Sequence, residues 1–323
     1  MRHRAIAAAS VATLVGGLTF VGAMAPAQAM EPTSDRGSNC FDPQAAGAAA
    51  KGGRHGVDHR DLSARERAAI EKRTQAILAR KAKHSATAGA TAGATAGATA
   101  VVSGATVPVY VHVMADAKGN GNVTNTQISQ QIAVLNKTYG GRESTAASNT
   151  GFTFTLAGTD RFFNTTWHKD KSSSTYRSQT RRGGANALNI WLVDFEPTLG
   201  IATFPWDYAR QPRIDGIRVQ YSSLPGGSET HFNLGETATH EAGHWFGLYH
   251  TFQGGCTNPN DEVRDTPAQS SPTSGCPQGR DSCALAGLDP IHNYMDYSFD
   301  SCYNQFTSGQ TSRMHTMFSA YRA

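Results

Sequence analysis

The sequence predicts an α+β fold with a regular N-terminal half and an irregular C-terminal part. Strand-like patterns occupy residues 107–113, 151–157, 187–194 and 213–221, and helical patterns occupy 126–138 and 235–248. Residues 251–292 are rich in Gly, Pro, Asp and Ser, and a last helical pattern covers 307–321. We therefore expect a mixed sheet with helices in an N-terminal subdomain, followed by an irregular C-terminal subdomain.

Two local signals support the first of these elements. Residues 107–113 alternate valine with other residues, as a strand with one buried face does. Asn125 is the expected N-cap of the helix at 126–138. The helix at 235–248 is amphipathic and carries the motif described below.

The first 29 residues have the features of an export signal. Arg2 and Arg4 precede an apolar stretch at 5–25, and Ala27-Gln28-Ala29 forms a small-x-small cleavage site. We predict cleavage after Ala29 and a secreted, extracellular protein. The alternative is a membrane-spanning helix, but the stretch is mostly Ala, Gly and Thr and is followed directly by the cleavage site. No other segment approaches the roughly 18 apolar residues that a span needs.

Residues 30–105 are expected to form a propeptide and a linker. Ser63 and Glu66 make a capping-box pattern ahead of a helix at 63–83, with Ile70 and Ile77 on one face. Residues 86–100 repeat Ala-Thr-Ala-Gly, a composition typical of a flexible linker. The sequence therefore divides into a signal peptide at 1–29, a pro-segment at 30–105 and a folded domain at 106–323.

The charge distribution disfavours nucleic acid as a partner. The formal net charge is +4, yet residues 1–105 hold 13 Lys/Arg and 7 Asp/Glu, whereas residues 106–323 hold 16 and 18. The basic character thus lies in the segment that we expect to be removed. We expect no nucleic-acid or membrane partner for the mature domain.

A histidine motif at 240–250 predicts a zinc site. On a helix, His240 and His244 lie one turn apart on the same face, and both imidazoles can bind one Zn²⁺. Gly247 lets the chain leave the helix, so that His250 can return as the third ligand. Three protein ligands leave one position open, as a catalytic zinc site requires. Glu241 points elsewhere around the helix and is the expected general base.

Two weaker interpretations of this motif remain open. The three histidines could be incidental residues of a surface helix, or they could hold a zinc ion that has no catalytic role. Five fixed residues at these offsets make the first interpretation improbable in a chain with 12 His. Glu241 argues against the second, because a structural zinc site needs no acid at that position.

A second motif brings out a family resemblance. Asn293-Tyr294-Met295-Asp296-Tyr297 follows the histidines, with Met295 45 residues after His250. The elongated zinc motif joined to such a Met-turn resembles the metzincin metallopeptidases, and within them the pappalysin family. Residues 248–256, Asp265-Thr266-Pro267 and the four C-terminal cysteines are also similar to that family. The resemblance runs from about residue 107 to the C-terminus and is most specific at 237–302.

The resemblance implies a secreted zinc-dependent endopeptidase that hydrolyses peptide bonds in proteins. A zinc-bound water, activated by Glu241, would attack the scissile carbonyl. Met295 would form the apolar floor beneath the imidazoles, and Tyr297 would stabilise the oxyanion. We expect the substrate to lie antiparallel to an edge strand, for which residues 217–221 are the candidate.

The resemblance also implies how the C-terminal part is stabilised. Four cysteines allow three pairings, and the family favours Cys256–Cys283 with Cys276–Cys302. Members of the family bind calcium near residues 256–267, where oxygen donors are abundant. The candidate calcium ligands are Asp261, Asp265 and Thr266, with Asn258 and Asn260 nearby; a solvated acidic loop is the alternative.

Two further residues are candidates for control of activity. In metzincins the segment after the Met-turn lines the pocket for the residue that follows the cleaved bond. Asp300 in that segment would favour Arg or Lys, unless it simply faces solvent. Cys40 stands alone in the pro-segment, and its thiolate could block the open zinc position in the proenzyme. The alternative is an incidental free thiol or a pairing between chains.

Two other functions stay open besides the endopeptidase. One is a secreted zinc-binding interaction module that has lost catalysis, and the other is a zinc amidase acting on cell-wall material. Expected partners are protein or peptide substrates, and the chain is expected to be monomeric. The expected cofactors are Zn²⁺ and, in the loop 256–267, Ca²⁺.

Overall fold

The structure is a computed structural model that describes residues 62–91, 101–195 and 198–323. The predicted signal peptide at 1–29 and the latency candidate Cys40 lie outside the described residues. So do residues 30–61 of the pro-segment and residues 92–100 of the linker.

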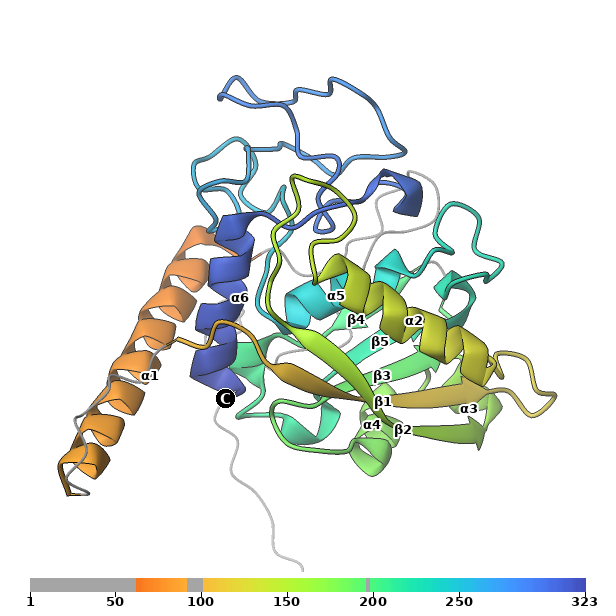
Figure 1. Ribbon diagram of the computed structural model, residues 1–323. Coiled ribbons are helices and arrows are strands. Elements are labelled where there is room, and N and C mark those ends of the chain that lie inside the picture. The colour runs from red at the N-terminus through yellow and green to blue at the C-terminus, as the bar shows by residue number, and fades with distance from the viewer. Residues whose placement is uncertain (1–61, 92–100, 196–197) are drawn as a thin grey trace, which may run out of the picture. The chain divides into compact units, whose positions relative to one another are not determined.

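A five-stranded mixed sheet forms the centre of the domain, as predicted (Figure 1). Its strands are β1 (Thr106–Ala115), β2 (Thr153–Phe163), β3 (Leu188–Val193), β4 (Gly200–Ala202) and β5 (Ile217–Gln220), in the order β2-β1-β3-β5-β4. The pairs among β2, β1, β3 and β5 are parallel, and β4 runs antiparallel to β5. The expectation that 217–221 forms an edge strand is therefore wrong. The short strand β4, which the sequence analysis missed, takes that edge.

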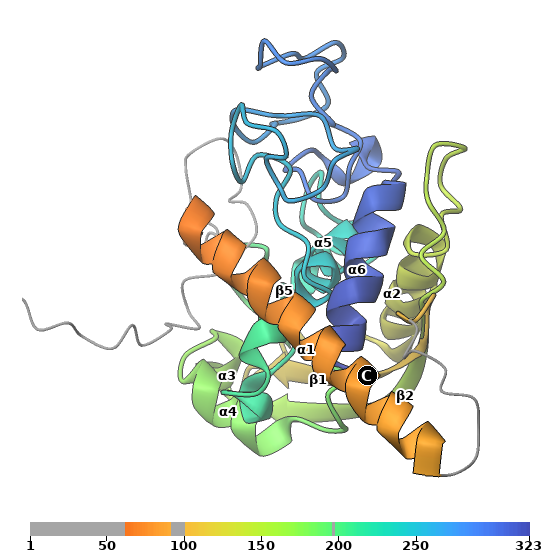
Figure 2. The ribbon, with the colours of Figure 1, turned by 90° about the vertical axis from the view of Figure 1, so that its left-hand side faces the viewer.

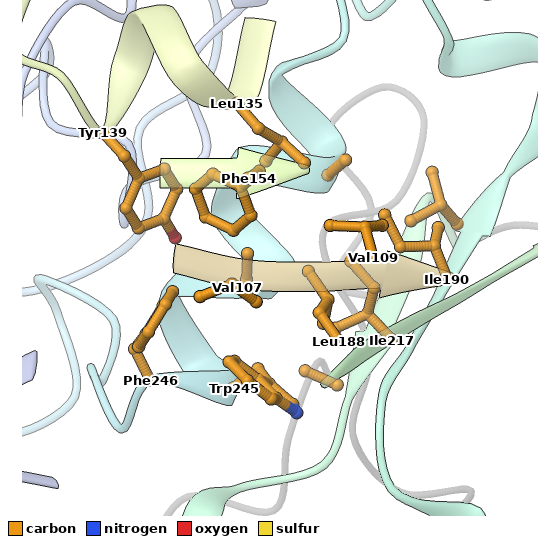
Figure 3. Packing of buried hydrophobic residues seen from close by; sticks show 14 of the residues in the cluster. Val107, Val109, Leu135, Tyr139, Phe154, Leu188, Ile190, Ile217, Trp245 and Phe246 are labelled. Atoms are coloured by element: carbon orange, nitrogen blue, oxygen red, sulfur yellow. The ribbon is translucent and has the colours of Figure 1, made fainter. Parts of the chain in front are cut away.

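Two helices cover one face of the sheet and enclose the main core. They are α2 (Asn125–Thr138) and the motif helix α5 (Glu236–Trp245). Alternate residues of β1, including Val107 and Val109, meet Leu135 of α2 and Trp245 of α5 in this core (Figure 3). Alternation works because successive strand side chains point to opposite faces. This packing fixes α5 against the sheet.

The other face carries two short helices that the sequence analysis did not predict. They are α3 (Thr165–His168) and α4 (Ser173–Thr180). A smaller core joins them to the sheet, in which Tyr176 of α4 packs with Met114 and Trp191. Four-residue and eight-residue helices give too short a periodic signal to recognise in sequence.

The N-termini of α2 and α6 follow the capping rules, but the predicted N-cap of α2 is wrong by one residue. Thr124, not Asn125, is the N-cap of α2, since its side chain accepts from Gln127 N and the Gln127 side chain accepts from Thr124 N. The same reciprocal arrangement links Thr307 and Gln310 at the start of α6 (Ser308–Tyr321). A reciprocal box satisfies two free N–H groups, which a single Asn cap cannot do.

The C-terminal part is irregular between α5 and α6, as expected. The stretch predicted as a strand at 213–221 is also shortened, because Pro212–Ile214 form a 3₁₀ helix before β5. Further 3₁₀ turns cover Pro205–Asp207, Tyr221–Ser223 and Asp300–Cys302. Two disulfides join Cys256 to Cys283 and Cys276 to Cys302, which is the pairing that the family resemblance implied.

Helix α1 (Ala64–Thr91) packs along α6 (Figure 2). It continues beyond the predicted end at 83, so residues 86–91 of the predicted linker are helical. Thr74 is fully buried and its hydroxyl lies 2.9 Å from Tyr321 Oη. Glu71 pairs with Arg313 of α6 at 2.8 Å. In the described part of the chain, no helix is both long and apolar enough to cross a membrane.

Candidate active site

Three imidazoles converge at the C-terminal half of α5 and the turn after it. His240 and His244 project from one face of the helix, and Gly247, with φ 98°, turns the chain so that His250 faces them. The three Nε2 atoms are separated by 3.0, 3.1 and 3.3 Å. All three residues are buried.

Backbone carbonyls fix the orientation of two of the rings. Nδ1–H of His240 donates to Tyr294 O at 2.6 Å, and Nδ1–H of His244 donates to Leu248 O at 2.8 Å. Because a carbonyl oxygen only accepts, the Nε2 atoms of these rings carry lone pairs that are directed at the common centre. Each ring is thus held in the tautomer that a metal ligand needs.

The donor set fits a zinc ion. With Zn–N bonds of about 2.0–2.1 Å, tetrahedral ligand atoms lie about 3.3 Å apart, close to the observed triangle. Burial lowers the pKa of His240 to about 4, so its imidazole is neutral. Another cluster of possible ligands, Cys276, His292 and Cys302, contains two disulfide-bonded cysteines, which leaves it without thiolates.

Glu241 lies beside this centre with an unusual environment. Its side chain is fully buried, and within the described part of the chain neither carboxylate oxygen has a hydrogen-bond partner. Burial raises the pKa of Glu241 well above its ordinary value, and the charge of Arg218 acts in the opposite direction. A buried, unpaired carboxyl group is costly for the fold, which indicates a functional role.

The Met-turn lies directly against the zinc motif. Met295 is fully buried, and its Sδ occupies the space beside Gly243, where an added Cβ would come within 2.4 Å of it. Thr251 N donates to Met295 O at 3.2 Å, and the preceding carbonyl, that of Tyr294, holds His240. The turn therefore supports the site through its backbone as well as through its methionine.

Tyr297 lies at the rim of the histidine cluster. Its hydroxyl is 3.3 Å from His250 Nε2, and its ring centroid is 5.7 Å from that of His240. The phenol hydroxyl thus borders the point on which the three Nε2 atoms converge.

Asp300 is neither exposed nor free in the structure. It is 4% exposed, and its Oδ2 accepts from Leu234 N at 2.8 Å, just before α5. Burial raises the pKa of this carboxyl to about 7. It lines a small cavity of about 20 Å³ beside His240, together with Leu199, Phe232, Glu236, Thr237, Tyr297 and Tyr303. The alternative of a solvent-facing Asp300 is wrong.

Two of the candidate calcium ligands, Asp261 and Asp265, are engaged with different partners. Asp265 accepts from Thr307 Oγ1, Ser308 Oγ and Gly309 N, so both of its oxygens serve the first turn of α6. Asp261 is buried and accepts from Val263 N at 3.0 Å, and burial raises its pKa to about 7. This arrangement gives Asp265 a structural explanation that needs no cation.

The sequence analysis missed two contributions to the site. Gly200 of β4 lies against the Glu241 side chain, and the Tyr294 carbonyl orients His240. Neither had a local signal, because the first contact joins residues 41 apart and the second uses a backbone atom.

Together, the zinc-type histidine triad, the buried acid and the Met-turn on a mixed sheet define a metzincin-type zinc metallopeptidase. Residues 196–319 match the family model described as pregnancy-associated plasma protein-A. An extracellular metalloprotease of Neurospora crassa is 50% identical over 224 residues, which cover 67% of this chain and 76% of that protein. One of Sordaria macrospora is 49% identical with the same coverage.

Solved structures agree with this fold. Mirolysin in complex with a molecule named compound 9 is 30% identical with a TM-score of 0.62, covering 69% of this chain and 94% of that one. A promirolysin variant of Tannerella forsythia is 27% identical with a TM-score of 0.61 and covers 79% of this chain and 90% of that one. The chain belongs to the pappalysin family and is an extracellular zinc metalloendopeptidase.

Proposed function

We propose that His240, His244 and His250 bind the catalytic zinc ion and that Glu241 is the general base. The observation that carries this assignment is the 3.0–3.3 Å triangle of Nε2 atoms next to a buried carboxylate without a partner. A bound zinc ion polarises the scissile carbonyl and makes water more acidic. Glu241 takes a proton from the attacking water and delivers it to the leaving amine.

Tyr297 is proposed to stabilise the oxyanion that forms at the scissile carbonyl. Its hydroxyl lies 3.3 Å from His250 Nε2. From that position it would donate a hydrogen bond to the oxyanion. A donor placed where negative charge develops acts on the transition state more than on the substrate.

The substrate is proposed to pair with β4 in place of β5. β4 is the strand at this edge of the sheet, and Gly200 in it contacts Glu241, so a chain paired there would pass the general base. Backbone pairing to an edge strand tolerates many sequences, which suits an endopeptidase.

The decisive experiment compares casein and muropeptide hydrolysis by the purified mature protein. Casein cleavage that is lost with a chelator, restored by zinc and absent in Glu241→Gln supports the endopeptidase. Cleavage of muropeptides alone would favour the cell-wall amidase, and zinc binding without either activity would favour the silent interaction module. Gel filtration of the same sample tests the expected monomer.

Asp300 is proposed to favour a basic residue just after the cleaved bond. Its support is its position in the cavity beside His240, where Glu236 supplies a second buried acid. Asp300→Asn keeps an oxygen that can accept from Leu234 N and removes the charge, so it tests specificity with little change to the fold. The expected result is a loss of preference for Lys and Arg in a peptide-library profile, and an unchanged profile would rule the role out.

Calcium binding by Asp261 and Thr266 is a weaker proposal, because Asp265 is engaged with α6. Both residues are buried in the loop. If calcium binds there, adding it to the zinc-loaded enzyme raises the melting temperature. No shift with calcium would remove the proposal.

We also propose that residues 30–105 are a propeptide and that Cys40 keeps the proenzyme inactive. The match to a promirolysin supports a proenzyme stage. Proenzyme carrying Cys40→Ala should cleave substrate before processing. If it is as inactive as unaltered proenzyme, another group blocks the cleft.

A further inference from the structure

The edge strand β4 touches the general base at a single residue. A Cβ added to Gly200 would lie 2.5 Å from Glu241 Cγ and Oε1 and 2.7 Å from its Cδ. These three atoms are the nearest neighbours, and they all belong to one side chain. The Glu241 carboxyl group therefore occupies the space that any other residue at position 200 would fill.

Space, and not backbone conformation, explains glycine at this position. Gly200 is not among the glycines with positive φ, so an alanine would meet no backbone strain there. Gly247, in contrast, has φ 98° and needs glycine for the turn.

The strand is held more firmly than the side chain that it touches. Gly200 and Ile201 pair with Val219 and Arg218 of β5, and Gln220 N donates to Leu199 O at 2.7 Å. The Glu241 carboxylate has no hydrogen-bond partner to hold it within the described residues. If the two must separate, the end of the glutamate moves, because rotating a side chain costs less than breaking ladder bonds.

We propose that Gly200 is a positioning residue for Glu241. Because Gly200 has no side chain, Glu241 can lie against β4, the strand that a substrate would pair with. One strand then positions both the general base and the substrate. This inference rests on the proposed role of Glu241 as the base. It concerns the chain itself and does not require Gly200 to touch the metal.

Gly200→Ala should act on kcat and leave binding and folding nearly unchanged. A displacement of about 1 Å of a catalytic group can cost about 100-fold in rate. We expect kcat to fall about 10- to 100-fold, while KM changes less than threefold. Zinc content and the melting temperature of the variant should match those of the unaltered enzyme.

Two controls make the experiment specific. Gly184→Ala adds the same methyl group in an exposed loop, where its Cβ would meet only Asn186 Oδ1 at 3.3 Å, and it should leave kcat unchanged. In a Glu241→Gln background, Gly200→Ala should cause little further loss, because the displaced group is already inactive.

The outcomes separate this inference from the proposed function. An unchanged kcat, a loss that lies wholly in KM, or full additivity with Glu241→Gln would overturn the role of Gly200. A loss of zinc or a lower melting temperature in step with the rate would also overturn it, in favour of a structural role. An active Glu241→Gln enzyme would instead remove the general base itself.

Discussion

The central sheet and the irregular residues 246–307 are held together in different ways. The sheet is stabilised by apolar side chains that alternate along strands, such as Val107 and Val109 on one face and Trp191 on the other. The irregular segment has no ladder, and buried polar side chains replace it. Gln269, for example, accepts from Thr251 Oγ1 and donates to Asp296 Oδ1.

This difference teaches how each region tolerates change. Altering one apolar side chain of the sheet removes only part of the stabilisation of the core, because many other side chains pack there as well. A polar network depends on particular donors and acceptors, and a missing one leaves a buried group unpaired. The proposed active site takes His240, Glu241 and His244 from the sheet-packed helix and His250 and Tyr297 from the irregular segment.

The largest expected effect comes from Glu241, which lies on the helix that packs against the sheet. Glu241→Gln should lower kcat by about 10³-fold or more, because general-base catalysis by a positioned carboxylate is worth about 10²–10⁴-fold. The fold should be unchanged or slightly more stable, since a buried carboxyl without a partner is removed. Kinetics and thermal melting on one preparation check both parts, and an active variant would contradict the assignment.

Removing one disulfide should affect the irregular segment more than the sheet. Cys276→Ser with Cys302→Ser should cost about 3–4 kcal/mol of unfolding free energy, from the chain-entropy estimate for a loop of this length. Cys302 ends the 3₁₀ turn that begins at Asp300, beside the cavity next to His240, so kcat should fall too.

The other disulfide offers a matched control. Cys256 and Cys283 are separated by 27 residues and Cys276 and Cys302 by 26, so the entropic losses should be nearly equal. Only the 276–302 variant should lose activity at a temperature where both are folded. Equal losses of activity would mean that the segment responds as one unit.

Tyr297→Phe tests the irregular segment's own contribution to catalysis. Losing one hydrogen bond to the oxyanion should lower kcat about 10- to 100-fold with little change in KM. Steady-state kinetics with a peptide substrate would show it. A rise in KM at constant kcat would mean that the phenol binds substrate and does not act on the transition state.

The smallest expected effect lies where α1 packs against α6, which in turn contacts the irregular segment. Arg313 of α6 pairs with Glu71 and donates from Nε to Gly247 O, within the zinc motif. Glu71→Gln should lower the stability of the full chain by about 1 kcal/mol, because the buried arginine loses its charged partner. Lys72→Gln, at an exposed position of the same helix, should have no measurable effect. Equal melting temperatures for both variants would show that α1 does not support the motif through this pair.

The sequence by itself predicted the histidine triad, because helical spacing places His240 and His244 on one face, and in the structure His250 Nε2 lies within 3.3 Å of both other Nε2 atoms. It also predicted most strands and both main-domain helices that cover the core, since their apolar periodicity is long enough to recognise. The Met-turn and the disulfide pairing came from family resemblance, and the structure contains both.

Tertiary structure alone decided which strand forms the edge of the sheet and which residue lies beside Glu241. β4 is three residues long, too short for a periodic signal, and its place next to β5 follows from a reversal of the chain. The contact between Gly200 and Glu241, and the bond from Leu234 N to Asp300, join residues far apart in sequence. Such contacts are set by how whole elements pack, which no local pattern of residues encodes.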